Sequence, residues 1–153
     1  MTRAIMSLVV IFSIVAPATN GVAKARDVAK EAVDEIETMT RFIRIEGNLG
    51  LGLDDKPGRT SVLLDRIIES PNATEYLAQL SRSRNVVSRL VAAEGFGVMK
   101  SERGLAILQK LKNDTATAEL VDGGDDGKIR VSVARFASRS LSRYYANEPL
   151  PQK

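Results

Sequence analysis

Residues 22–43, VAKARDVAKEAVDEIETMTRFI, form the most regular segment of the chain. Small or apolar side chains recur alternately four and three residues apart, on one stripe of a helix. This stripe consists of Ala25, Ala29, Ala32, Ile36, Met39 and Ile43. Charged residues occupy most of the remaining positions. The pattern predicts an amphipathic helix that packs on its own domain, with a coiled-coil or partner-binding helix as the alternative.

The segment before this helix is typical of an export signal. Arg3 is followed by thirteen uncharged, mostly apolar residues, and small residues then stand where a signal peptidase must fit. The predicted signal peptide is 1–18, with cleavage after Ala18 and a second candidate site at Ala23. A retained membrane anchor and a buried N-terminal helix are the alternatives. An anchor needs about 20 apolar residues to cross the bilayer, and Pro17 closes this run sooner.

The composition restricts the chemistry that the chain can carry out. It has 22 basic and 19 acidic residues in 153, with no cysteine and no histidine. The missing histidine excludes hydrolases built on that side chain and removes the commonest zinc ligand. We therefore expect no catalytic residue, no cofactor and no metal site, and a protein that works by binding. An enzyme that uses two carboxylates is the remaining catalytic alternative.

A glycine-rich stretch at 47–59, GNLGLGLDDKPGR, is the clearest candidate boundary. It separates an N-terminal amphipathic segment, 19–46, from a helical binding domain, 60–146. The stretch is no phosphate-binding loop, because Arg59 stands where that loop needs lysine and the glycine spacing is too long. The last residues, 147–153, contain two prolines and are expected to be a disordered tail.

Three helices are predicted between this linker and the C-terminal region, at 61–70, 72–94 and 101–112. Asn72, with Glu75 three residues later, matches a capping box for the second helix. Gly95 and Gly97 are expected to end that helix. Ser101 is expected to cap the third.

The spacing of apolar residues changes after residue 113. Residues 128–133 alternate strictly between apolar and polar side chains, and 115–121 can pair with them across an acidic turn at 122–127. The turn is not a calcium loop, because Gly124 and Val133 stand where that loop needs ligands. The sequence thus predicts a mainly α fold, a small helical bundle with a β-hairpin near the C-terminus, and the α+β class is the alternative.

A basic face is predicted on the last helix, 135–146. Arg135, Arg139 and Arg143 recur every four residues, with aromatic side chains on neighbouring faces. Such a face suits weak contact with anionic lipid headgroups or RNA. A merely solvated face is the alternative.

Two Asn-x-Thr triplets, at Asn72 and Asn113, match the acceptor pattern for N-glycans. They matter only if the chain passes through a eukaryotic secretory pathway. Asn72 is explained equally well as a helix cap.

The tetrapeptide Arg41-Phe42-Ile43-Arg44 follows the predicted cleavage site by about twenty residues. It resembles the Arg-x-Leu-Arg motif of secreted oomycete effectors, with isoleucine in place of leucine. Those proteins also have a signal peptide, an acidic patch, here Asp54-Asp55, and a small helical domain. The resemblance implies that residues 41–44 direct processing or delivery into a host cell, where the later domain binds a host protein to suppress defence. A bacterial periplasmic or envelope binding protein is the alternative.

Overall fold

The computed structural model describes residues 19–46, 56–121 and 128–146, and its fold is mainly α, as the sequence predicts. Cleavage at Ala18, the acidic patch Asp54-Asp55, the turn 122–127 and the tail 147–153 lie outside the described residues. Six helices form in this part of the chain: α1 (Thr19–Thr38), α2 (Arg59–Ile68), α3 (Ala73–Leu80), α4 (Val86–Met99), α5 (Glu102–Leu111) and α6 (Val133–Tyr145). Five short strands accompany them: β1 (Arg41–Ile43), β2 (Ile45–Glu46), β3 (Lys56–Pro57), β4 (Thr117–Val121) and β5 (Lys128–Ser132).

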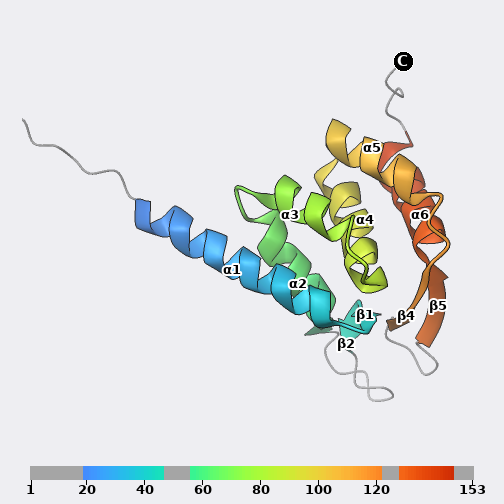
Figure 1. Cartoon of the computed structure of the whole chain (residues 1–153), viewed down its shortest axis with the longest axis horizontal. Helices are drawn as coiled ribbons and strands as arrows, with labels where there is room; N and C mark the ends of the chain where they lie inside the picture. Colours follow the sequence, from blue (N-terminus) through green and yellow to red (C-terminus); the bar gives the residue numbers. More distant parts are fainter. Residues whose placement is uncertain (1–18, 47–55, 122–127, 147–153) are drawn as a thin grey trace, which may run out of the picture.

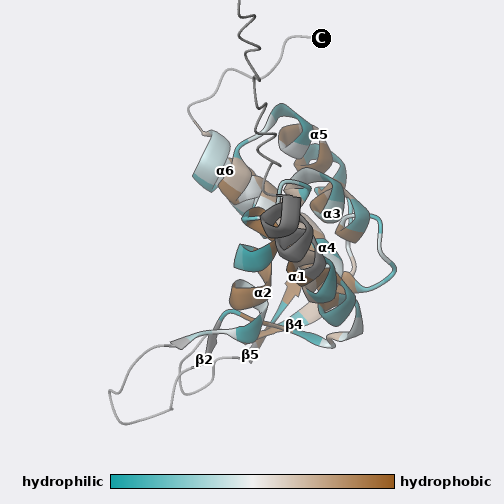
Figure 2. Ribbon diagram, turned by 90° about the vertical axis from the view of Figure 1, so that its left-hand side faces the viewer, coloured by the Kyte–Doolittle hydropathy of each residue, from teal (hydrophilic) through white to brown (hydrophobic). Residues whose placement is uncertain are grey.

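Helix α4 lies at the centre of the fold. It packs against the five other helices and against β1 and β4, and Figure 1 shows it between α3 and α6. Its sequence, VVSRLVAAEGFGVM, is apolar on nearly every side, and a helix with that pattern must be surrounded by protein. By contrast, hydrophilic and hydrophobic residues alternate along α3 and α5 (Figure 2), as expected of helices buried on one side only.

Two glycines lie inside α4 and do not end it, so the predicted stop was wrong. A Cβ atom on Gly95 would lie 2.7 Å from Cδ2 of Leu77, and one on Gly97 would lie 2.6 Å from Cδ2 of Tyr144. The glycines therefore let α3 and α6 approach the backbone of α4 closely. The helix ends instead at Lys100, which adopts a left-handed conformation with a φ of 47°.

The predicted helix 72–94 is two helices, α3 and α4, joined by residues 81–85. Asn85 begins α4, and its Oδ1 accepts a hydrogen bond from the Val87 N–H at 2.8 Å. The capping box predicted at Asn72 is absent, because its side chain makes no capping hydrogen bond. The cap predicted at Ser101 is confirmed, since its Oγ accepts the Gly104 N–H at 3.0 Å.

Helix α1 carries part of the predicted apolar stripe and is shorter than expected. Ala29, Ala32 and Ile36 are buried, and α1 packs on α2 and α3. The segment 19–46 therefore shares one hydrophobic core with the later helices. The helix ends at Thr38, and the prediction that it continues to Ile43 was wrong because residues 41–43 form β1.

The sheet has the strand order β1-β4-β5. Strands β4 and β5 form the predicted antiparallel hairpin, while β1 pairs parallel to β4 with Phe42 opposite Leu120. In the predicted linker, residues 56–57 form β3 and pair with β2, and α2 already begins at Arg59. Residues 47–55 of that linker lie outside the described residues.

Candidate anion-binding site

Helix α6 presents its arginines on the side turned away from the core. Its N-terminus is capped by Ser132, whose Oγ accepts the Arg135 N–H at 3.1 Å. The inner face buries five residues: Val133, Phe136, Ala137, Ser140 and Tyr145. The three arginines of the predicted basic face, Arg135, Arg139 and Arg143, are all exposed.

A second element, β1, brings Arg44, the residue that follows it, to the same region. The Arg44 N–H donates to the Val121 carbonyl at 2.9 Å, and the Arg44 carbonyl accepts from the Gly58 N–H at 2.9 Å and the Ser61 Oγ at 3.1 Å. Gly58 is required at this position because a Cβ there would lie 2.4 Å from the Ile43 carbonyl oxygen. These contacts fix the backbone from which the Arg44 side chain extends.

Glu94 of α4 is the acid around which these side chains gather. Its Oε1 lies 3.8 Å from a terminal nitrogen of Arg44 and accepts a hydrogen bond from the Tyr144 hydroxyl at 3.4 Å. The guanidinium of Arg143 lies 5.2 Å from the centre of the Tyr144 ring, within range of a cation–π contact. Burial, with the charge of Glu94 beside it, raises the pKa of Tyr144, so the hydroxyl stays protonated and able to donate at neutral pH.

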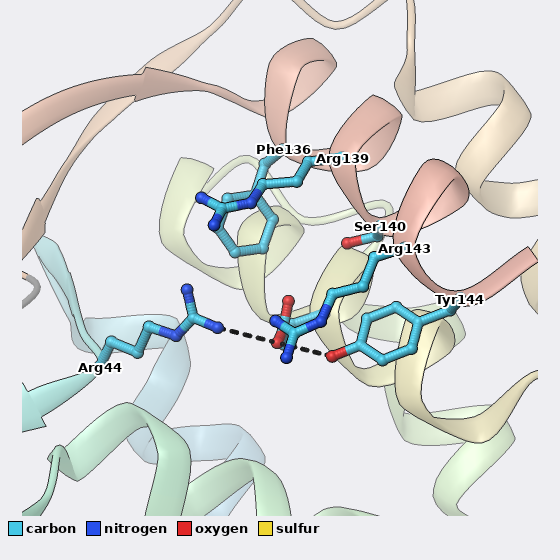
Figure 3. A pocket seen from close by; sticks show the side chains of 7 residues that line it. Arg44, Phe136, Arg139, Ser140, Arg143 and Tyr144 are labelled. Atoms are coloured by element: carbon cyan, nitrogen blue, oxygen red, sulfur yellow. Dashed lines mark hydrogen bonds and ion pairs between the residues drawn. The ribbon is translucent and has the colours of Figure 1, made fainter. Parts of the chain in front are cut away.

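These side chains line a small depression, shown in Figure 3, which we call the arginine pocket. Its lining consists of Arg44, Glu94, Phe136, Arg139, Ser140, Arg143 and Tyr144. Its volume of about 10 Å³ holds at most one water molecule. Any larger ligand would therefore rest on the guanidinium groups and not enter the fold.

The charges of the arginine pocket do not balance. Arg44 is paired with Glu94, but Arg139 and Arg143 form no ion pair with any acid in the described part of the chain. Two positive charges are thus left in excess. Arg135 lies on the same helix face but does not line the pocket.

The tetrapeptide 41–44 divides into residues with different environments. Arg41 is exposed and lies 3.9 Å from Glu119 across the sheet. Phe42 is only 2% exposed and its ring centre lies 5.5 Å from that of Phe136. Ile43 is half-buried, and its N–H donates to the Thr60 Oγ1 at 2.8 Å.

The glycosylation candidates lie apart from this site. Asn72 is half-buried at the start of α3, and Asn113 is exposed just after α5. A second, wider groove of about 470 Å³ lies along β4, between the end of α1 and the start of α4. It contains one acid, Glu119, and one base, Arg130, so it has no excess charge of either sign.

Sequence reasoning missed Glu94 and the role of Arg44. One signal pointed to Glu94, because the one acid in a helix that is apolar on nearly every side needs a cation or hydroxyl partner. Within the described ranges, no group of three metal-binding side chains occurs, and no helix combines the length and apolar character needed to cross a membrane. No protein-family model matches the chain, and no curated protein matches it either.

Proposed function

We propose that this chain is an exported binding protein that recognises an acidic segment of a partner protein through the arginine pocket. The observation that carries the proposal is the charge imbalance, in which Arg139 and Arg143 face the same opening as Arg44 and have no acid of their own. Arginine suits this role because its planar guanidinium binds carboxylates through two parallel hydrogen bonds. Export rests on the N-terminal sequence pattern alone.

Binding, and not delivery, is the role that we assign to Arg44. A receptor that reads residues 41–44 as a linear motif would have to reach Ile43, which is half-buried and whose N–H is bonded to the Thr60 Oγ1. Arg44 can meet a ligand in the folded protein, because a quarter of its side chain is exposed. The host-cell destination implied by the effector resemblance stays a proposal that depends on the tetrapeptide.

The test compares two charge-reversal variants of the full chain. R139E/R143E changes the pocket, while R82E/R84E changes two exposed arginines before α4 and alters the net charge by the same amount. Binding of a fluorescent ten-residue glutamate peptide is measured by polarisation at low salt. At about 1 kcal/mol for each exposed ion pair, we expect R139E/R143E to lose roughly 30-fold in affinity and R82E/R84E to stay near the wild type. Equal losses in both variants would show that only net charge matters.

A further inference from the structure

We infer that the arginine pocket selects a phosphate monoester, carried on a phosphorylated side chain of the partner protein. This inference rests on the proposed function and makes it more specific. An ordinary acidic segment offers carboxylates, each with one negative charge. The pocket is built for a group with more charge and more oxygen atoms than a carboxylate has.

The number of guanidinium groups is the first reason. Arg44, Arg139 and Arg143 reach the depression from two separate elements, and Figure 3 shows their side chains extending toward one opening. A phosphate monoester has three terminal oxygens arranged around one phosphorus atom, so it can accept hydrogen bonds from three directions. A carboxylate has two oxygens in one plane and is already satisfied by one or two arginines.

The size of the charge excess is the second reason. Arg139 and Arg143 leave two positive charges after Arg44 has paired with Glu94. A phosphate monoester carries about −1.5 to −2 at pH 7, which neutralises this excess, whereas one carboxylate removes only half of it. A quarter of the Arg44 side chain is exposed, so a ligand can contact its guanidinium beside Glu94.

The surroundings of the pocket favour a protein ligand over a bilayer. Membrane-binding surfaces combine basic residues with exposed apolar side chains that enter the headgroup region. Among the described residues, the exposed large apolar side chains are Val98 and Ile129, and neither lines the pocket. A single phosphate group on a flexible segment needs no such apolar contact.

The experiment uses three fluorescent pentapeptides that differ only in the central residue: phosphoserine, glutamate or serine, each between pairs of glutamates. At pH 7.5 the full chain should bind the phosphoserine peptide about tenfold more tightly than the glutamate peptide. This preference should shrink below pH 6, because the monoester then takes up a proton while the arginines keep their charge. Inorganic phosphate should compete.

Two single substitutions on α6 separate the pocket from the general basic face. R139A should remove the preference for phosphoserine, while R135A, an equal charge change on the same helix face, should retain it. Circular dichroism checks that both variants fold, which we expect because both side chains are exposed.

The possible failures are distinguishable. Equal binding of the phosphoserine and glutamate peptides would overturn the phosphate inference and leave the acidic-partner proposal standing. No binding of either peptide would overturn both. Tighter binding to vesicles that contain phosphatidate than to the phosphoserine peptide would show that the phosphate belongs to a lipid, against the inference.

Discussion

Replacing Asn85 with alanine tests how the N-terminal segment is held on the rest of the fold. The Asn85 Oδ1 caps α4 through the Val87 N–H, while its Nδ2 donates to the carbonyls of Glu37 at 2.8 Å and Met39 at 2.9 Å. One amide side chain thus satisfies backbone groups at the start of one helix and at the end of another. Asn85→Ala removes these three hydrogen bonds and a longer one, at 3.5 Å, to the Ile36 carbonyl.

The expected cost is worked from those contacts. Loss of an N-cap costs about 1 kcal/mol, and each carbonyl bond of this half-buried side chain about 0.5 kcal/mol, since water can partly replace it. The free energy of unfolding should therefore fall by about 2 kcal/mol. With a denaturant slope of about 2 kcal/mol per molar, the urea midpoint should fall by about 1 M.

Asn72→Ala is the matched control, because Asn72 occupies the same position before α3 but makes no capping bond through its side chain. Its free energy of unfolding should change by less than about 0.5 kcal/mol. Asn85→Asp separates the two functions of the side chain, since it keeps the capping oxygen and loses the amide donor. If Asn85→Ala and Asn72→Ala unfold at the same urea concentration, the bridging role of Asn85 is refuted.

Three further predictions concern the pocket and the N-terminus. Gly97→Ala should push Tyr144 away from α4 and lower the free energy of unfolding, measured in urea, by about 1–3 kcal/mol. An unchanged urea midpoint would mean that α6 can move away from α4 without loss of stability. Because burial and the charge of Glu94 raise the pKa of Tyr144 above its ordinary value of 10.0, its contribution to stability is complete below about pH 10 and is lost as the pH rises through the folded-state pKa. Glu94→Gln should lower that pKa, and ultraviolet titration of the phenol would detect the change. Secreted material should begin near Thr19 or Lys24 by N-terminal sequencing, and an intact Met1 on soluble exported protein would contradict export.

Local patterns predicted the elements that local interactions define. The hairpin follows from strict alternation in residues 128–133 and from a turn that joins neighbouring strands. The cap at Ser101 depends only on a backbone N–H three residues away. The cap can be identified from residues 101–104 and the hairpin from residues 115–133.

Elements that depend on distant partners were predicted wrongly, because a local pattern does not contain those partners. Residues 41–43 continue the spacing of the helix before them, and three residues are too few to distinguish a helical period from an alternating one. Their strand forms because Phe42 fills the core against Phe136 and because β4, far along the chain, offers its parallel edge. A local rule predicts a helix end at Gly95 and Gly97, because glycine is a poor helix former. Both lie inside α4 because the neighbouring helices leave no room for a side chain there.

The arginine pocket shows where such reasoning reaches its limit. The stripe on α6 could be predicted from spacing alone, but the same spacing gives Arg135 equal weight with Arg139 and Arg143. The fold distinguishes them, because Arg44 and Glu94 arrive beside two of the three only after β1 has paired with β4 and α4 has packed on α6. A ligand that distinguishes R135A from R139A would therefore be recognising the tertiary arrangement and not the helical repeat of charge.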